Sequence, residues 1–316
     1  MCYDLTYIAG RENEQKERKK EKKQMGRSIL ENDKIKLEMD SLGAEVKSLF
    51  GKNSGREYMW HGDPAYWGRT APVLFPFVGS LKDKKYRVNG RKYGMGQHGF
   101  ARDMEFTLLE QNKDNIRFVL ESDEETRKKY PFDFSLELGY ALNESSVRVF
   151  WKVINKGKEE MPFSIGGHPA FMCPVLPETV QTDYYISFDA DQPLISDVIE
   201  DGLIGDALKE YSLENGYLKI TDDLFDGDAL IMEKDQAHSV SLCLPDKTPY
   251  LTVKFGAPLF GIWSPVKKNA PFICIEPWYG RADRVRFDQE LRDREWSNLL
   301  KNEEIFEASY DIVIYE

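Results

Sequence analysis

Apolar and polar residues alternate over most of the chain, in short segments separated by turn signals such as Asn-Gly, Asn-Lys-Gly and Gly-Lys-Asn. A period of two residues is typical of a strand with one buried face. The protein is therefore predicted to be predominantly β. The segments with this pattern are 33–40 (DKIKLEMD), 45–51 (EVKSLFG), 86–95 (YRVNGRKYGM), 115–122 (NIRFVLES), 133–142 (DFSLELGYAL), 146–155 (SVRVFWKVIN), 184–189 (YYISFD), 239–245 (SVSLCLP), 250–256 (YLTVKFG), 271–277 (PFICIEP) and 311–316 (DIVIYE).

Only two stretches favour a helix. In residues 122–131 (SDEETRKKYP), Ser122 is placed to cap a short helix that ends before Pro131. Residues 288–300 have some helical character, although polar residues interrupt the apolar face. Neither stretch could supply the crossovers that parallel strands need, so the sheets are expected to be antiparallel.

Residues 28–316 contain no Pro/Gly/Ser-rich linker, no shift in composition and no internal repeat. One domain is therefore predicted, of the all-β class, as a large antiparallel β-sandwich. A sandwich of this size has concave faces and end loops where a ligand can bind.

The first residues have a different character. Every residue from Lys16 to Lys23 is charged, and such a run cannot bury apolar surface. Residues 1–27 are predicted to be a charged, disordered tail. Because Met25 comes just before the first predicted strands, we also hypothesise that the functional chain starts there.

Composition and charge restrict the partners. With 41% hydrophobic and 13% aromatic residues, the 316-residue chain can form a sizeable core. The net charge of −11 repels phosphate backbones and anionic lipids, so neither nucleic acid nor a membrane is expected as a partner, and a small neutral ligand fits better. The sequence leaves open whether the protein is a monomer or a homodimer.

The cysteines and the chain start favour a cytoplasmic protein. The four cysteines are far apart, without a CxxC pair, and are expected to be reduced thiols. The chain has no signal-peptide-like start and no run of about 18 apolar residues.

Histidine is scarce, and two of the four histidines lie in unusual glycine-rich stretches. His98 occurs in GMGQHGFARD and His168 in FSIGGHPAF. Glycines beside a polar side chain permit unusual backbone angles and close approach of a ligand. Taken singly, each is still more often a structural histidine, and that is the interpretation kept for His61 and His238.

Two further stretches contain charged residues beside apolar runs. In FICIEPWYGRAD, Glu276 directly follows a buried strand, and burial would raise its pKa into the range useful for a general base. The alternative is a strand-end glutamate held by Arg281 or Arg284. Arg69, in WGRTAPVLFPFVG, would by itself be a salt-bridge partner.

An imidazole and a carboxylate suit proton transfer at hydroxyl groups near neutral pH. Other chemistries fit less well, because the sequence has no G-x-S-x-G elbow, no phosphate-binding loop, no G-x-G-x-x-G and no H-E-x-x-H. A metal site of His98, His168 and Glu276 would need ligands from distant segments without clustered spacing, so no metal is expected.

Four stretches together resemble the aldose 1-epimerase (galactose mutarotase-like) family, and more closely its bacterial LacX-like branch. They are WGRTAPVLFPFVG, YGMGQHGFARD, FSIGGHPAF and GIWSP followed by APFICIEPWYGRAD, in the family's order. The resemblance spans residues 28–316. It implies the supersandwich of that family, with a sugar on a concave sheet face and neither a metal nor an organic cofactor.

The resemblance also implies roles for single residues. Glu276 matches the general base and His168 the general acid, while His98 and Arg69 match residues that bind the sugar. An aspartate orients the sugar in the family, and in LFDGDALIM this is Asp228 or, as an alternative, Asp226.

The activity implied is interconversion of the α and β anomers of an aldohexose. Glu276 would take the proton of the C1 hydroxyl while His168 protonates the ring oxygen, which opens the ring. Reclosure on the other carbonyl face gives the opposite anomer. Gly166 and Gly167 would let the chain turn sharply, with Pro169 fixing the exit.

Aromatic side chains near these stretches have two possible roles. Trp67, Trp278 and Tyr279 could stack on the C–H faces of a pyranose, or they could be ordinary core residues.

Two other functions remain open. Arg102 in HGFARD could, with Arg69, clamp the phosphate of a hexose 6-phosphate. The protein could also be a non-catalytic carbohydrate-binding protein, but such a protein would be expected to lack the acid or the base, and both are present.

Overall fold

The computed structural model describes residues 26–316. Strand β1 (Arg27–Glu31) begins at Arg27, one residue before the predicted domain start. Residues 1–25 of the predicted tail, including the proposed start at Met25, lie outside the described part of the chain. The predicted end of the tail at residue 27 was wrong, because Arg27 already belongs to β1.

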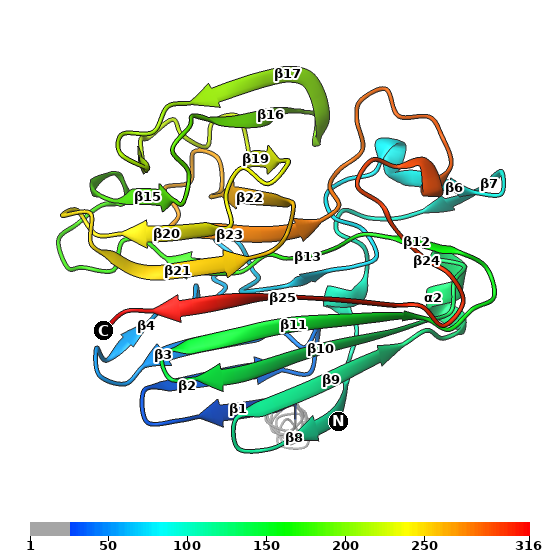
Figure 1. The fold of residues 1–316 in the computed structure, drawn as a ribbon, viewed down its shortest axis with the longest axis horizontal. Coiled ribbons are helices and arrows are strands. Elements are labelled where there is room, and N and C mark those ends of the chain that lie inside the picture. Colours follow the sequence, from blue (N-terminus) through cyan, green and yellow to red (C-terminus); the bar gives the residue numbers. More distant parts are fainter. Residues whose placement is uncertain (1–25) are drawn as a thin grey trace, which may run out of the picture.

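Two large antiparallel sheets dominate the structure (Figure 1). The larger has nine strands, in the order β18-β15-β20-β21-β25-β11-β10-β9-β8. Its strands are β8 (Thr107–Gln111), β9 (Asn115–Glu121), β10 (Phe134–Asn143), β11 (Ser146–Asn155), β15 (Tyr185–Phe188), β18 (Tyr217–Lys219), β20 (Ser239–Cys243), β21 (Pro249–Phe255) and β25 (Ile305–Ile314).

The second sheet has eight strands, seven in the order β17-β16-β19-β22-β23-β13-β5, with β14 also paired to β23. Its strands are β5 (Val73–Leu74), β13 (Ile165–Gly167), β14 (Ala170–Met172), β16 (Leu194–Glu200), β17 (Leu203–Tyr211), β19 (Leu230–Glu233), β22 (Leu259–Trp263) and β23 (Phe272–Tyr279). The predicted all-β antiparallel sandwich is thus confirmed.

Smaller elements complete the fold. A four-stranded sheet contains β1, β2 (Ile35–Asp40), β3 (Val46–Gly51) and β4 (Arg56–Glu57), and two-stranded sheets join β6 (Lys85–Val88) to β7 (Arg91–Gly94) and β12 (Met161–Phe163) to β24 (Asn298–Leu300). The short helices are η1 (Lys82–Lys84), η2 (Ala101–Asp103), α2 (Glu124–Lys129), η3 (Gln181–Asp183) and η4 (Leu291–Asp293).

The two helix predictions had different outcomes. Helix α2 lies inside the predicted range, but its cap is Asp123, whose side chain accepts the backbone N–H of Thr126. The Oγ of Ser122 instead accepts the backbone N–H of Phe134. The prediction for residues 288–300 was wrong, because only the single turn η4 and strand β24 form there.

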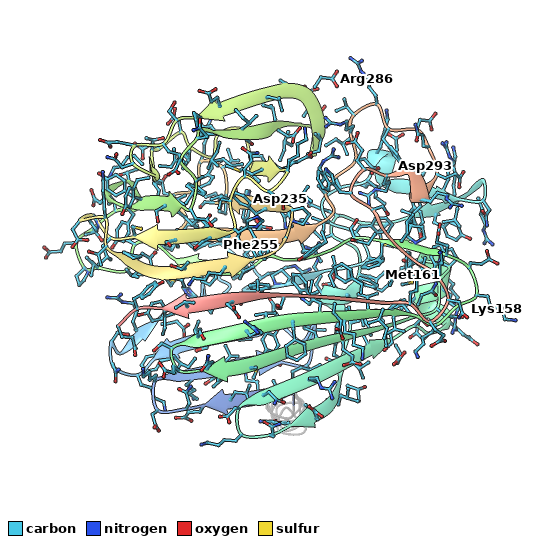
Figure 2. All side chains as sticks on the ribbon, in the orientation of Figure 1. Lys158, Met161, Asp235, Phe255, Arg286 and Asp293 are labelled. Atoms are coloured by element: carbon cyan, nitrogen blue, oxygen red, sulfur yellow. The ribbon has the colours of Figure 1, made fainter. Side chains whose placement is uncertain are left out.

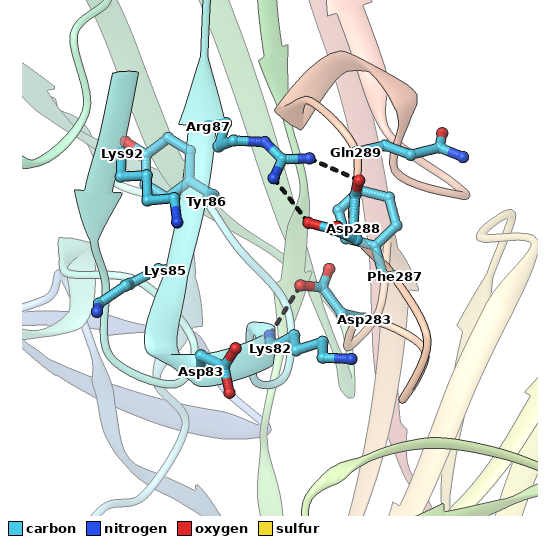
Figure 3. A pocket seen from close by; sticks show the side chains of 10 residues that line it. All are labelled: Lys82, Asp83, Lys85, Tyr86, Arg87, Lys92, Asp283, Phe287, Asp288 and Gln289. Atoms are coloured by element: carbon cyan, nitrogen blue, oxygen red, sulfur yellow. Dashed lines mark hydrogen bonds and ion pairs between the residues drawn. The ribbon is translucent and has the colours of Figure 1, made fainter. Parts of the chain in front are cut away.

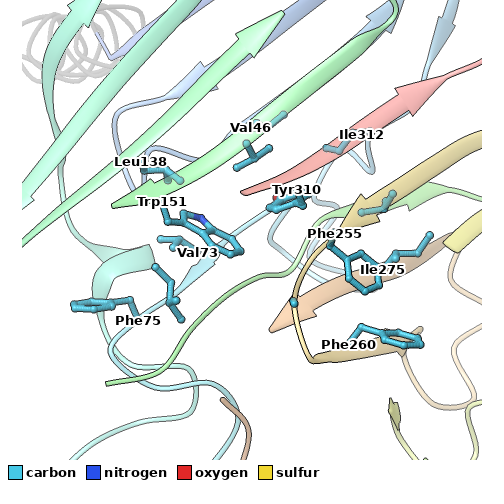
Figure 4. Packing of buried hydrophobic residues seen from close by; sticks show 14 of the residues in the cluster. Val46, Val73, Phe75, Leu138, Trp151, Phe255, Phe260, Ile275, Tyr310 and Ile312 are labelled. Atoms are coloured by element: carbon cyan, nitrogen blue, oxygen red, sulfur yellow. The ribbon is translucent and has the colours of Figure 1, made fainter. Parts of the chain in front are cut away.

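The main core lies between the two large sheets. Figure 4 shows Ile275 and Phe260 of the eight-stranded sheet in one cluster with Trp151, Phe255 and Tyr310 of the nine-stranded sheet. Exposed charged side chains such as those of Lys158 and Arg286 project from the rim (Figure 2).

Alternation along β23 divides its side chains between two faces. Ile273 and Ile275 belong to the main core, whereas Cys274 and Trp278 belong to two separate clusters on the outer face of the eight-stranded sheet. Glu276 lies between these two, so it also points to the outer face. Among residues 26–316, no helix is both long and apolar enough to cross a membrane.

Candidate active site

The register of three strands places His168 opposite Glu276. Gly166 of β13 pairs with Trp278, and Ala170 of β14 pairs with Cys274, so the residue between the two strands faces position 276 of β23. The Nε2 atom of His168 lies 3.3 Å from Oε2 of Glu276. Two residues that are 108 positions apart in the chain (276 minus 168) thus become cross-strand neighbours.

The glycines before His168 do not form the sharp turn that we expected. Gly166 and Gly167 are strand residues with ordinary backbone angles. A Cβ atom on Gly166 would lie 2.6 Å from Cδ1 of Trp278, and one on Gly167 would lie 2.9 Å from the hydroxyl oxygen of Tyr310. Glycine is required here because neighbouring side chains occupy the space on both faces.

Glu276 is almost fully enclosed, with 1% of its side chain exposed. Burial raises its pKa well above the ordinary value, the Trp278 indole counteracts part of this effect, and the charge of Asp228 adds to it. The direction of this change in pKa is the one that the sequence predicted. The alternative of a glutamate held by Arg281 or Arg284 was wrong, since the side chains of both arginines pair with other carboxylates.

His168 is held between aromatic rings. The Trp67 ring stacks on the imidazole with centroids 4.6 Å apart, and Trp263 meets it edge-on at 5.5 Å. Burial lowers the pKa of His168 to about 3, and the positive charge of Arg102 contributes. A neighbouring carboxylate such as that of Glu276 favours the imidazolium ion, but burial has the larger effect on His168.

His98 lies beside His168, with ring centroids 5.6 Å apart. The backbone N–H of Gly79 donates to its Nδ1 over 3.1 Å, so the proton of the neutral ring is on Nε2. Burial lowers the pKa of His98 well below the ordinary value, which keeps this ring neutral. Its backbone is in the left-handed region at φ 65°. His98 is therefore a neutral donor near the candidate pair.

Two arginines flank the histidines. Arg69 donates to Oδ1 of Asp103 over 2.8 Å, and Nε of Arg102 lies 4.0 Å from Oδ2 of the same carboxylate. Burial and the charge of Arg69 lower the pKa of Arg102 to about 10. The Nε atom of Arg102 is buried and has no hydrogen-bond partner.

The two candidate aspartates differ in exposure. Asp228 is half-buried, has φ 77° and acts electrostatically on Glu276. Asp226 is exposed and lines another cavity of about 320 Å³, beside Thr221 and Lys267. Of the two candidates, Asp228 is thus the one whose charge reaches Glu276.

The three aromatic candidates lie in different environments. Trp278 shares the outer face with Glu276 and is buried. Its indole N–H is close enough to Glu276 to stabilise the carboxylate, but no acceptor lies in hydrogen-bond geometry with it. Tyr279 faces the opposite way and packs against Trp151 and Phe306. Trp67 contacts the candidate acid, and Tyr279 is a core residue.

Sequence reasoning missed two residues of this centre. Trp263 contacts His168, and its cross-strand partner Cys274 lies on the same face of β23 as Glu276. Burial raises the pKa of the Cys274 thiol well above the ordinary value, and the Glu276 carboxylate adds to this rise. The i, i+2 spacing of Cys274 and Glu276 was the signal that could have identified it.

The remaining histidines and the cavity in Figure 3 lie elsewhere. His61 and His238 are exposed, which agrees with the interpretation kept for them. The cavity, of about 420 Å³, lies between the β6–β7 hairpin and residues 283–289, where Arg87 pairs with Asp288 (Figure 3). No predicted site residue lines it.

The cysteines fit the expectation of reduced thiols. Cys173, Cys243 and Cys274 are free and buried. Cys2 lies outside the described residues.

Known proteins share both the sequence pattern and the fold. The family described as Aldose 1-epimerase matches residues 28–293. The plasmid-encoded protein LacX of Lactococcus lactis subsp. lactis is 33% identical over 295 residues, which are 90% of this chain and 98% of that protein.

Solved structures agree with this match. The galactose mutarotase related enzyme from Lactobacillus acidophilus is 35% identical with a TM-score of 0.87, over 92% of this chain and 97% of that one. A galactose mutarotase-like protein from Lactobacillus casei is 30% identical with a TM-score of 0.86, over 92% of this chain and all of that one. The chain, with His168 and Glu276 paired on its outer sheet face, belongs to the aldose 1-epimerase family.

Proposed function

We propose that this protein is an aldose 1-epimerase, which interconverts the α and β anomers of an aldohexose by opening and reclosing the sugar ring. The main support is the buried pair of His168 and Glu276, which lie 3.3 Å apart on the outer face of the sheet. Gly261 lies opposite Glu276 on the neighbouring strand, so no side chain projects from that position. Family membership is consistent with this chemistry.

In the proposed reaction, Glu276 accepts the proton of the C1 hydroxyl and His168 donates a proton to the ring oxygen. The bond between C1 and the ring oxygen breaks, and an open-chain aldehyde forms. Rotation about C1–C2 presents the other carbonyl face, and reclosure with reversed proton transfers gives the second anomer. Each such transfer is worth roughly 10²–10⁴ in rate.

The reaction needs one proton on the pair. Burial lowers the pKa of His168 to about 3 and raises that of Glu276. Burial therefore favours the arrangement in which the proton is on the carboxyl group and the imidazole is neutral. The assigned roles require this proton to pass to His168 when the sugar binds, over the 3.3 Å that separate the two groups.

Other residues are proposed to bind the sugar. The neutral Nε2–H of His98 and the guanidinium of Arg69 would donate to sugar oxygens, and Asp228 would accept from a hydroxyl. Arg102 and the indole N–H of Trp278 each have a buried donor without a partner, which a sugar oxygen could satisfy.

Polarimetry of a freshly dissolved α-anomer tests the proposal. The wild type should accelerate mutarotation of at least one aldohexose, and His168→Ala and Glu276→Gln should each lose roughly 10²–10⁴ of that rate while they remain folded. His238→Ala is the matched control, because its side chain is 46% exposed. If the wild type binds sugars but accelerates none, the protein is a non-catalytic carbohydrate-binding protein.

A hexose 6-phosphate is the second candidate substrate. Arg69 and Arg102 both pair with the carboxylate of Asp103, which is exposed. The Nε atom of Arg102 has no hydrogen-bond partner. A phosphate could take the place of that carboxylate between the two guanidinium groups. Turnover of glucose, galactose and their 6-phosphates should be compared, and a strict preference for the phosphates would favour this substrate class.

A further inference from the structure

A third potential metal ligand lies within the candidate centre. Cys274 precedes Glu276 by two residues on β23, so the two side chains share a face. The ligand atoms of His168, Cys274 and Glu276 all lie within 4.8 Å of one another, and all three residues are buried. The proposed sugar chemistry uses only two of these groups.

The three groups match the ligands that zinc prefers. An imidazole nitrogen, a thiolate sulfur and a carboxylate oxygen bind Zn²⁺ tetrahedrally at about 2.0–2.3 Å, which puts neighbouring ligand atoms about 3.3–3.7 Å apart. His168 Nε2 and Glu276 Oε2 are already 3.3 Å apart. Side-chain adjustments of about 1 Å would bring all three atoms into this range.

One of the three groups also has unused hydrogen-bonding capacity. Within residues 26–316, Oε2 of Glu276 is buried without a hydrogen-bond partner. A buried polar atom without a partner is unfavourable, and a cation bound to this oxygen would compensate for it. The cluster around Cys274 is otherwise apolar, with Trp60 and Phe272 fully buried in it.

His98 does not belong to this ligand set. Its Nδ1 accepts the backbone N–H of Gly79, so Nε2 carries the proton and offers no lone pair to a metal. The set therefore has three protein ligands and one open position, which differs from the His98, His168 and Glu276 combination considered from the sequence.

We propose that His168, Cys274 and Glu276 bind a thiophilic divalent cation of the Zn²⁺ class, and that this ion blocks the centre instead of serving as a cofactor. The thiol proton passes to solvent as the metal–sulfur bond forms. Mg²⁺ and Ca²⁺ should not bind, because they require more oxygen ligands. Binding is independent of the proposed function, whereas inhibition rests on it.

Co²⁺ titration of the full-length, chelator-treated protein tests binding. Tetrahedral thiolate coordination gives Co²⁺ intense absorption bands, and the wild type should show them saturating at one ion per chain. Cys274→Ser should abolish the bands, while Cys173→Ser and Cys243→Ser, which change equally buried thiols, should retain them. Cys2→Ser controls for the thiol outside the described residues.

Zn²⁺ competition against Co²⁺ then measures the change in affinity. Loss of an outer partner of a metal ligand costs 10–100-fold, so loss of the Cys274 ligand should weaken binding by about 100-fold or more. Glu276→Gln, a second and nearly isosteric variant, should also weaken Zn²⁺ binding. It tests the site even if Cys274→Ser does not fold. Thermal unfolding confirms that each variant is folded.

Inhibition is measured by polarimetry. Zn²⁺ should suppress wild-type mutarotation, a chelator should restore it, Mg²⁺ should have no effect, and Cys274→Ser should need about 100-fold more Zn²⁺. Wild-type Co²⁺ bands that are absent, or that persist in Cys274→Ser, would overturn the metal site. Bands with the expected dependence but no mutarotation of any sugar would support the site and contradict the proposed function.

Discussion

Burial decides the properties of the individual polar residues in this protein. His168 and Glu276 are titratable groups with 9% and 1% of their side chains exposed. Desolvation penalises a charge on either residue, so the pKa of the imidazole falls and that of the carboxyl group rises. The pair consequently holds one proton at pH values between the lowered pKa of His168 and the raised pKa of Glu276.

This protonation state predicts an unusual pH profile. The lowered pKa of His168 means that the imidazole stays neutral as the pH falls through 6.5, and gains a proton only near pH 3. From about pH 5 to about pH 8, kcat/KM should therefore show no inflection from His168. Polarimetric kcat/KM, corrected for the uncatalysed rate, measures this.

The ionisation of Glu276 should determine the alkaline limb of the same kcat/KM profile. Its raised pKa means that the pair loses its only proton well above the ordinary range of a carboxyl group. An acidic limb near the ordinary histidine pKa that disappears in a His168 variant would contradict this account of the pair.

Exposure also separates the two aspartates before β19. Asp228→Asn should raise KM for the sugar by about tenfold or more, because a hydrogen bond to a charged group contributes about 1.5–3 kcal/mol. Asp226→Asn is the matched control and should leave KM unchanged, because Asp226 is exposed. Steady-state kinetics on both variants tests this, and the reverse result would assign the role to Asp226.

At the scale of elements, β23 and its neighbours form the site together. Trp278 lies across two glycines, since a Cβ atom on Gly261 would be 2.4 Å from its Cη2 and one on Gly166 would be 2.6 Å from its Cδ1. Gly261 is also the cross-strand partner of Glu276. A side chain at position 261 would therefore disturb both the indole and the space beside the carboxyl group.

Gly261→Ala should destabilise the protein by about 1–3 kcal/mol through overpacking, and should also lower kcat/KM. Chemical denaturation and polarimetry measure the two effects. Gly256→Ala is the control, because a Cβ atom there meets nothing within 4 Å. If Gly261→Ala and Gly256→Ala lowered stability and kcat/KM equally, contact with Trp278 would not be the cause of the loss.

The strands differ in how well the sequence predicts them. The long strands β10 and β11 alternate over ten residues and are predicted correctly. Strands β5 and β13 have two and three residues, which is too short for a period of two to be detected, and β8 is exposed along its whole length. The short strands matter most for the site, because β13 leads directly to His168.

At the scale of the whole molecule, one sandwich with a shared core carries the site. The side chains proposed for catalysis and binding come from separate segments between Arg69 and Trp278, and all lie within the range matched by the family. Strand β1 begins at Arg27.

A chain that starts at Met25 should have the kcat/KM and the thermal midpoint of the full-length protein. Polarimetry and thermal unfolding of the two chains, measured side by side, test this expectation. A large loss of activity or a lower midpoint on truncation would contradict the hypothesis that the functional chain starts at Met25.

The sequence by itself determined the fold class and the main candidates. Alternation along the strands reflects one buried face, a local property that is visible in a linear pattern. Glycines beside two histidines and a glutamate at the end of an apolar run singled out His98, His168 and Glu276 as candidates. Their roles came from the ordered resemblance of four stretches to the aldose 1-epimerase family.

Only the tertiary structure decided how these residues are placed and how burial affects them. Strand register brings His168 to Glu276, and burial on the outer face reverses the protonation that a simple ion pair would have. Cys274 was not a candidate until the two faces of β23 were known. Distances and desolvation depend on segments remote in sequence, and the sequence pattern does not encode them locally.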